Sequence, residues 1–426
     1  MKFDSTDLSL AKQLDEKDKL KDFQKEFIHT DSKTIYLDGN SLGKLPFKTQ
    51  QRLKEVVDKE WGEKLIKSWN EGWYELSGKV GSKIAKVIGA KENEVIAADS
   101  TSINLYKLVF AALKVSPGRN KIVTDEFNFP SDHYILQSIV NQFKDEYQIE
   151  IIKSRNGITI DIDDVEKAVD ENTAVVTLSH AAFKSAFLYD MEEVTKIAHD
   201  KGAYVVWDLS HSAGTVDIKL NKANADLAIG CTYKYLNGGP GAPAFLYVRE
   251  DLQEKLSSPI WGWFGDKNPF EFNLQFKKAE GIHKFQIGTP PIISLSAVDS
   301  SIDITLEAGI KNIREKSVLM TEYLIYLVSE LLLPLGFNIG SPVDSNIRGS
   351  HVSIRHKDGY KICKAIMDER NEKVVIPDFR KPDNIRLGVS SLYNSFEDVW
   401  EAVQLIKKVT ESGTYKNYKT TVTAVT

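Results

Sequence analysis

Ala203-Tyr-Val-Val-Trp207-Asp208 and, further along, Cys231-Thr-Tyr-Lys-Tyr-Leu-Asn-Gly-Gly-Pro-Gly241 are the stretches of sequence that decide the fold. The first is a short apolar run that ends in an acid, which is typical of a buried strand whose carboxyl end reaches a ligand site. The second follows another such run, 227–230, and carries Lys234 as its only charged residue. Both stretches predict strands of one buried sheet with chemistry at its edge.

Similar short apolar runs occur on both sides of these stretches, at 95–98, 121–124, 150–152, 173–178 and 245–248. Amphipathic stretches separate most of them, which predicts an α/β fold: a mostly parallel sheet, of the seven-stranded type, flanked by helices. The run 245–248 follows a glycine-rich turn and is expected to be antiparallel.

The ends of the chain predict a second, smaller domain. A helix is expected near the N-terminus within 1–30 and another over about 47–61, and one long connecting helix over about 306–335. Strands at 351–354 and 385–388 then flank a helix, as in an α+β unit. We expect a large domain over 50–305 and a small one built from 1–49 and 306–426.

Composition narrows the classes of function. The 426 residues include 55 Lys and Arg against 60 Asp and Glu, a net charge of −5, which argues against a nucleic-acid or membrane-surface partner. No apolar run approaches the ~20 residues of a membrane helix. Two distant cysteines, Cys231 and Cys363, with no secretory leader, predict a reducing compartment, the cytoplasm.

Two common kinds of catalytic site are disfavoured. Gly39-Asn-Ser-Leu-Gly43 matches the G-x-S-x-G pattern of serine hydrolases, but Gly43 and Pro46 prevent the helix that must follow a nucleophilic Ser41. The eight histidines are scattered and show no metal-ligand spacing, so no metal is expected. A serine hydrolase using Ser41 stays a distant alternative.

The acid and the lysine of the opening stretches point to pyridoxal 5′-phosphate. This cofactor needs a carboxylate on its ring nitrogen, here Asp208, and a lysine on its aldehyde carbon, here Lys234. Ser100-Thr101-Ser102 opens a predicted helix and offers hydroxyl and N–H groups to a phosphate. Phe129 and Asp132 follow another strand and are expected beside the ring. Arg386 is the candidate residue to bind a substrate carboxylate through paired guanidinium hydrogen bonds.

Motifs in the same order over about residues 30–410 resemble the kynureninase family, closest to its bacterial form. They are Tyr36-Leu-Asp-Gly-Asn-Ser-Leu-Gly43, Trp61-Gly-Glu, Ser68-Trp-Asn70, Thr101-Ser-Ile-Asn-Leu105, Asn128-Phe-Pro-Ser-Asp132, Trp207-Asp-Leu-Ser-His-Ser-Ala-Gly214, Cys231 to Gly241, Gly262-Trp-Phe-Gly265, Gly288-Thr-Pro-Pro291 and Gly349-Ser-His-Val352. The resemblance implies a pyridoxal-phosphate enzyme of fold type I, in the aspartate aminotransferase superfamily.

The resemblance also implies roles for individual residues. Lys234, Tyr233 and Asp208 would be catalytic. The cofactor would be bound by Thr101, Ser102, Phe129, Asp132, Ser179, Asp208, His211, Tyr233 and Lys234, with Trp263 and Thr289 reaching it from the partner subunit of a homodimer. The substrate would be bound by Arg386, Trp69, Asn40 and Ser41.

The implied reaction is hydrolysis of L-kynurenine to anthranilate and L-alanine in tryptophan catabolism, with 3-hydroxykynurenine as a further substrate to consider. Two positions depart from the family: Ala182-Phe-Lys-Ser-Ala186, and Asp266 where a histidine is expected. The nearest alternative is another lyase of fold type I, such as a cysteine desulfurase. That chemistry needs a nucleophilic cysteine on a mobile loop, which neither Cys231 nor Cys363 matches.

Overall fold

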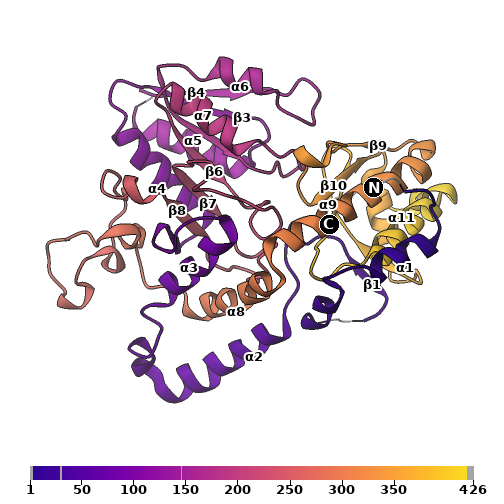
Figure 1. Cartoon of the computed structure of the whole chain (residues 1–426), viewed down its shortest axis with the longest axis horizontal. Helices are drawn as coiled ribbons and strands as arrows, with labels where there is room; N and C mark the ends of the chain where they lie inside the picture. The colour runs from indigo at the N-terminus through magenta and orange to yellow at the C-terminus, as the bar shows by residue number, and fades with distance from the viewer. Residues whose placement is uncertain (1–2, 29–30, 145, 420–426) are drawn as a thin grey trace.

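The computed structural model describes residues 3–28, 31–144 and 146–419, and the chain forms two lobes joined by helices α8 and α9 (Figure 1). The larger lobe holds a seven-stranded sheet in the order β2-β8-β7-β6-β5-β3-β4. The strands are β2 (Val95–Ala97), β3 (Lys121–Asp125), β4 (Gln148–Ile152), β5 (Thr173–Ser179), β6 (Tyr204–Asp208), β7 (Leu227–Gly230) and β8 (Phe245–Val248). β8 is antiparallel to both of its neighbours, β2 and β7, whereas the other strand pairs described in this sheet are parallel. The α/β fold class and the antiparallel strand are confirmed.

Both faces of this sheet are buried because its strands are apolar at successive positions. Val205 and Trp207 pack into the core on one face, whereas Val206 between them packs into the core on the other. The flanking helices are α3 (Leu76–Ile88), α4 (Thr101–Lys114), α5 (Pro130–Gln142), α6 (Ile162–Ala168), α7 (Met191–Asp200) and α8 (Ile292–Ala308). Because side chains on both faces of the sheet are buried, the sequences of these strands are hydrophobic at successive positions and do not alternate with polar residues.

The smaller lobe holds an antiparallel sheet in the order β12-β13-β10-β9 and joins both ends of the chain. Its elements are β9 (Asn338–Ile339), β10 (His351–Arg355), α10 (Gly359–Ile366), β11 (Val374–Ile376), β12 (Asp378–Arg380), β13 (Asn384–Gly388) and α11 (Phe396–Glu411). From the N-terminal segment, α1 (Leu8–Glu16) lies beside α11 and β1 (Thr34–Tyr36) pairs with β11 (Figure 1). Ala11 and Leu37 share a core with Leu324 and Ile385. The expected division at residues 50 and 305 stays a prediction.

Three helices differ from their predicted extent. The connector over 306–335 is not continuous: α8 ends at Ala308, Gly309 takes a φ of +78°, and α9 runs over Ile310–Leu331. The helical spacing near the N-terminus is divided between two elements: α1 ends at Glu16, Asp18 accepts a hydrogen bond from the backbone N–H of Leu20, and a 3-10 helix follows over Lys21–Glu26. Helix α2 (Phe47–Glu55) continues as a π-helix over Val56–Lys64.

Short 3-10 helices fill several of the connections. They are Lys21–Glu26, Leu65–Trp69, Glu92–Glu94, Glu250–Leu252, Trp263–Gly265, Pro269–Glu271, Gly281–Phe285, Leu333–Leu335, Ser345–Ile347 and Thr414–Asn417.

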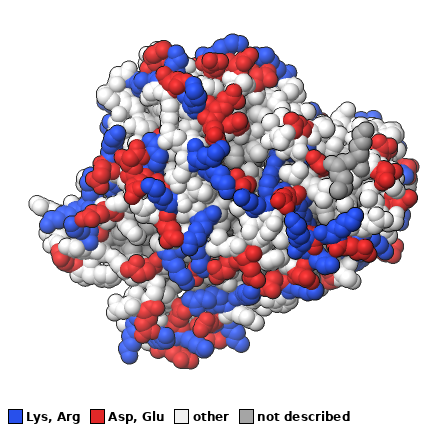
Figure 2. All heavy atoms as spheres, in the orientation of Figure 1, with Lys and Arg blue, Asp and Glu red and all other residues white. Residues whose placement is uncertain are grey.

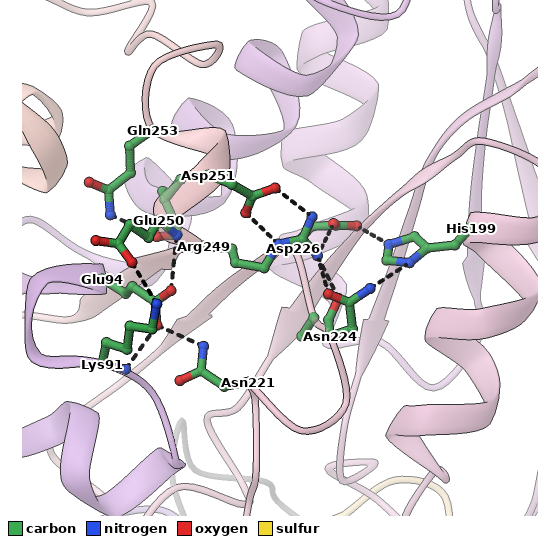
Figure 3. Close-up of polar contacts among 12 residues, drawn as sticks. Lys91, Glu94, His199, Asn221, Asn224, Asp226, Arg249, Glu250, Asp251 and Gln253 are labelled. Atoms are coloured by element: carbon green, nitrogen blue, oxygen red, sulfur yellow. Dashed lines mark hydrogen bonds and ion pairs between the residues drawn. The ribbon is translucent and has the colours of Figure 1, made fainter.

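A polar network ties the amino ends of the central strands together (Figure 3). The buried Asp226 accepts hydrogen bonds from the Val205 N–H (2.9 Å) and from His199 Nε2 (2.8 Å), and it pairs with Arg249 (3.0 Å). Because its hydrogen bonds and ion pair offset the free-energy cost of burying a charge, the Asp226 carboxylate can connect the first residues of neighbouring strands; without these partners its burial would destabilise the fold. The network fixes the sheet from the end opposite to the carboxyl ends of its parallel strands.

The surface is mixed in charge. Acidic and basic side chains are interspersed over the face shown in Figure 2. Within the described ranges, no helix is long and apolar enough to cross a membrane.

Candidate functional site

A cavity of about 670 Å³ lies at the carboxyl ends of the parallel strands. Ser179 ends β5, Asp208 ends the neighbouring β6 in register with it, and Lys234 follows β7. Ligands bind at this edge of an open α/β sheet because the strand ends and helix N-termini meet there. The predicted residues that line the cavity are Asn40, Ser41, Thr101, Ser102, Phe129, Asp132, Ser179, Asp208, His211, Tyr233, Lys234, Thr289 and Arg386.

The lysine is held by a histidine. Lys234 Nζ lies 3.0 Å from His211 Nε2. Burial lowers the pKa of His211 well below its usual range, and the charge of Lys234 lowers it further. The imidazole is therefore neutral and accepts a hydrogen bond from the amine. Burial also raises the pKa of Tyr233, so its hydroxyl keeps its proton.

Two buried carboxyl groups face the same space. Burial raises the pKa of Asp208, and it raises the pKa of Asp132 well above its usual value, with the charge of Asp208 adding to the effect. Lys234 opposes both shifts. Asp208 also accepts a hydrogen bond from the Ser210 N–H (2.9 Å). A cationic ring nitrogen placed beside Asp208 would lower its pKa again and stabilise the carboxylate.

An anion-binding helix end forms another wall. Helix α4 begins at Thr101, and the side chain of Ser100 caps it by accepting from the Ile103 N–H. Ser102 Oγ lies 2.9 Å from Ser131 Oγ, so hydroxyls from α4 and α5 meet here. The free N–H groups and the positive end of the helix dipole favour a phosphate at this place.

An aromatic pair borders the cavity. Phe129 is the residue before Pro130, at the start of α5, and 44% of it is exposed. Its ring meets Phe183 edge to face at 5.3 Å. The exposed ring face is available to stack on a flat ligand.

The arginine expected to bind a carboxylate is deeply buried. Arg386 on β13 forms an ion pair with Asp378, its cross-strand neighbour on β12. It also donates to Ser41 Oγ (3.1 Å) and to the carbonyl oxygen of Phe183 (2.5 Å). Arg380 lines the same cavity and shares Asp378 at 3.0 Å. The Arg386 guanidinium thus contacts residues of both lobes, Asp378 in the smaller lobe and Phe183 in the larger one.

The turn over residues 39–43 packs against the lysine loop and is not a nucleophile elbow. The Gly43 N–H donates to the Tyr233 carbonyl (2.8 Å), and a Cβ at residue 43 would overlap the Lys234 carbonyl oxygen. The next helix begins only at Phe47. Ser41 accepts a hydrogen bond from Arg386, and Gly43 allows the close approach of the two backbones.

Two predicted residues lie away from the cavity of their own chain. Trp69 lies in a separate hollow and packs on Phe264 (5.7 Å between ring centres). Trp263 also packs on Phe264, at 4.5 Å. Thr289, expected to reach a partner's site, lies on the wall of its own chain's cavity. The roles of these three residues stay predictions.

Asp266 makes hydrogen bonds within its own loop. Its carboxylate accepts hydrogen bonds from the Asn268 N–H (2.8 Å) and the Lys277 N–H (2.7 Å), and these bonds lower its pKa. It does not line the cavity.

Several lining residues were missed by sequence reasoning, namely Asp99, Phe183, Ser131, Ser210 and Arg380, as was Asp378 behind Arg386. Ser131 and Ser210 each lie within two residues of a predicted site residue, so closeness along the chain could have found them. Phe183 and Arg380 carry no such signal. In the described part of the chain, no group of three or more His, Cys, Asp or Glu side chains is placed to hold a metal ion.

The cavity fits pyridoxal phosphate. Buried polar groups that lack a hydrogen-bond partner among the described residues point to a missing ligand: the side-chain amide of Asn40, Asp132 Oδ2 and His211 Nδ1. The helix end suits the phosphate, Asp208 the ring nitrogen and Lys234 the aldehyde carbon.

Comparisons with known proteins agree with this geometry. Residues 313–406 match the kynureninase C-terminal domain, and residues 56–221 match the DegT/DnrJ/EryC1/StrS aminotransferase family. The chain is 39% identical over 407 residues to a kynureninase of Pseudomonas fluorescens, covering 94% of this chain and 95% of that protein. It is 38% identical to a kynureninase of Burkholderia pseudomallei, covering 90% of each.

Solved structures share the fold at low sequence identity. An apo cysteine desulfurase from Thermococcus onnurineus has a TM-score of 0.79 at 21% identity, covering 92% of this chain and 98% of that one. A C-DES mutant with glycine covalently linked to its PLP cofactor has a TM-score of 0.78 at 14% identity, covering 90% and 98%. In this chain Cys231 and Cys363 are buried, which raises both thiol pKa values, so neither suits a desulfurase nucleophile. The resemblance seen in the sequence is confirmed: the chain belongs to the kynureninase family.

Proposed function

We propose that this protein hydrolyses L-kynurenine to anthranilate and L-alanine with pyridoxal 5′-phosphate as its cofactor. The observation that carries the proposal is that Lys234, Asp208, the N-terminus of α4 and Arg386 all border one cavity. Sequence identity to two kynureninases over nearly the whole chain supports the same reaction. The cofactor, when bound, supplies an electrophilic carbon and an electron-accepting ring.

Different residues that line the cavity bind the substrate and the cofactor. Arg386 holds the substrate carboxylate, since a guanidinium offers paired donors to two oxygens. Asn40 and Ser41 lie in the same wall, and the unpaired amide of Asn40 is free to hydrogen-bond the substrate. Thr101 and Ser102 hold the phosphate, and Phe129 stacks on the ring.

Proton movement falls to Lys234 and Tyr233. When the cofactor is bound, Lys234 would hold its aldehyde carbon and Asp208 its ring nitrogen, and the Lys234 amine would take the proton from the substrate Cα. Water adds to the γ-carbonyl carbon of the substrate. When the Cβ–Cγ bond then breaks, the γ-carbon leaves as the carboxyl group of anthranilate, and the β-carbon keeps the electron pair and needs a proton. Tyr233 supplies it, since burial keeps its hydroxyl protonated.

We further propose a homodimer whose subunits share their sites, in the cytoplasm. Helix α2 and the segment between β8 and α8 stand out from the body of the molecule (Figure 1). The second segment exposes apolar side chains, with Phe272 73% and Trp261 67% exposed. Such exposure supports a protein contact there. Both cysteines are free, which supports a reducing compartment.

The test uses the purified protein loaded with the cofactor and L-kynurenine, with anthranilate fluorescence as the measure. We expect turnover by the wild type and its loss in Lys234→Ala, together with loss of the visible absorbance of the bound cofactor. Lys222→Ala, on the surface, is the matched control and should behave as wild type. A yellow, active Lys234→Ala protein would refute the proposal. Inhibition by a fluorophosphonate would instead favour Ser41 chemistry.

A further inference from the structure

Lys107 is a fully buried lysine that the proposed reaction does not use. It lies on α4, the helix whose N-terminus faces the cavity, and its side chain has no exposed surface. Its Nζ donates to Asp99 Oδ2 (2.7 Å) and to the carbonyl oxygen of Phe285 (2.7 Å). Burying an ammonium group is costly, so a lysine in such a place needs these partners.

The first partner shapes the turn before the helix. Asp99 lines the cavity and takes a φ of +52°, in the left-handed region that non-glycine residues rarely adopt. This conformation turns the chain from β2 into α4. Side chains on a helix lean toward its N-terminus, so the long side chain of Lys107 reaches back along α4 to this turn. The backbone of Asp99 is also fixed, because its carbonyl accepts from the Ala244 N–H (2.8 Å).

The second partner belongs to a distant segment of the chain that packs in the same core as α4. Phe285 is buried at the end of the 3-10 helix Gly281–Phe285, from which the chain runs on to Thr289 at the cavity. One ammonium group therefore links the turn before the helix end to the segment that carries Thr289.

We infer that Lys107 is a positioning residue that, through Asp99, holds the N-terminus of α4 in the geometry that binds the cofactor phosphate. The inference rests on the proposed phosphate-binding role of Thr101 and Ser102. It predicts that loss of Lys107 weakens binding of the phosphate group and spares the rest of the cofactor.

The experiment titrates the full-length apoprotein with pyridoxal 5′-phosphate and, separately, with pyridoxal, which lacks the phosphate, following absorbance of the bound compound. For Lys107→Met we expect affinity for pyridoxal 5′-phosphate to fall by about tenfold or more, as for loss of a charged hydrogen bond, and affinity for pyridoxal to stay within about twofold. Lys114→Met, on an exposed part of the same helix, should leave both unchanged.

Two further variants keep the test decisive. Asp99→Asn tolerates the left-handed backbone and keeps an oxygen for Lys107, so it should fold and show a smaller loss that is again confined to the phosphorylated compound. Equal weakening of both compounds, or no weakening in either Lys107→Met or Asp99→Asn, overturns the inference. If the wild type itself does not prefer the phosphorylated compound, or if Thr101→Val with Ser102→Ala keeps that preference, the proposed phosphate site fails instead.

Discussion

His211 Nε2 lies 3.0 Å from Lys234 Nζ, and burial keeps the imidazole neutral, so the ring accepts a hydrogen bond from the amine that is expected to bind the cofactor. The two residues come from different loops, one after β6 and one after β7. The imidazole thus fixes the amine at the floor of the cavity.

Replacing His211 with Phe removes that acceptor while keeping a ring. It also removes Nδ1, which lacks a hydrogen-bond partner among the described residues and is expected to face the cofactor, so we expect affinity for pyridoxal 5′-phosphate to fall by about tenfold. Titration of the apoprotein measures it. His133→Phe, on α5 and outside the cavity, is the control, and an unchanged affinity in His211→Phe would contradict the assigned contact.

Arg386, the proposed partner of the substrate carboxylate, forms an ion pair with Asp378. Arg386→Gln should raise KM for L-kynurenine by about tenfold to hundredfold, because a charged hydrogen bond to the carboxylate is lost. Asp378→Asn should also raise KM, by a smaller factor, with kcat nearly unchanged, because it only orients the guanidinium. Steady-state kinetics separate the two constants. An equal fall in kcat for Asp378→Asn would show that it acts beyond substrate binding.

Asp125 makes stability depend on pH. Burial raises its pKa to about 6, from 3.8 in an unfolded chain, although it accepts hydrogen bonds from Tyr189 and two backbone N–H groups. Between these values the folded state binds more protons than the unfolded state, so the stability that this group contributes is present below about pH 4 and is lost as the pH rises to about 6. The change amounts to about 3 kcal/mol.

Asp125→Asn should abolish this part of the pH dependence. Urea unfolding at pH 4.5 and pH 7, compared between wild type and variant, measures it. A stability difference between the two proteins that is the same at both pH values would contradict the assignment.

Asp226 stabilises the far end of the sheet without touching the cavity (Figure 3). Asp226→Ala removes an acceptor shared by Arg249, His199 and the buried Val205 N–H, and it should cost about 3 kcal/mol of unfolding free energy although Arg249 keeps Asp251 and Asn224 as partners. Activity of the folded fraction should not change. The control is Asp251→Ala, a 61% exposed partner of Arg249, expected to cost about 0.5 kcal/mol or less. Equal losses of unfolding free energy in Asp226→Ala and Asp251→Ala would contradict the prediction that the buried carboxylate contributes more to stability than the exposed one.

Sites shared between subunits would allow complementation. Lys234→Ala and Trp263→Ala chains should each be inactive, and mixing them after reversible dissociation should restore about a quarter of wild-type activity, because half of the random dimers contain one intact site of two. Mixtures that stay inactive, while dimers do exchange subunits, would contradict a shared site.

The sequence by itself predicted the strands of the seven-stranded sheet and the helix cap at Ser100, and it singled out Asp208 and Lys234, which border one cavity in the structure. These features depend on short stretches of sequence, through their hydrophobic periodicity, their capping residues and the residue types at strand ends. The order of the motifs along the chain indicated the family. The short strands β9, β11 and β12 of the smaller lobe were not predicted. Boundaries such as the break at Gly309 were less well predicted, since local patterns favour helix on both sides of it.

Only the tertiary structure decided which distant residues complete the site. Asp378 reaches Arg386 through the register of two strands, Gly43 meets the Lys234 loop by a close backbone approach, and Lys107 on α4 reaches the carbonyl oxygen of Phe285. Such contacts join segments far apart in the chain, and their partners are chosen by packing and by the need to pair buried charges, which no local periodicity records.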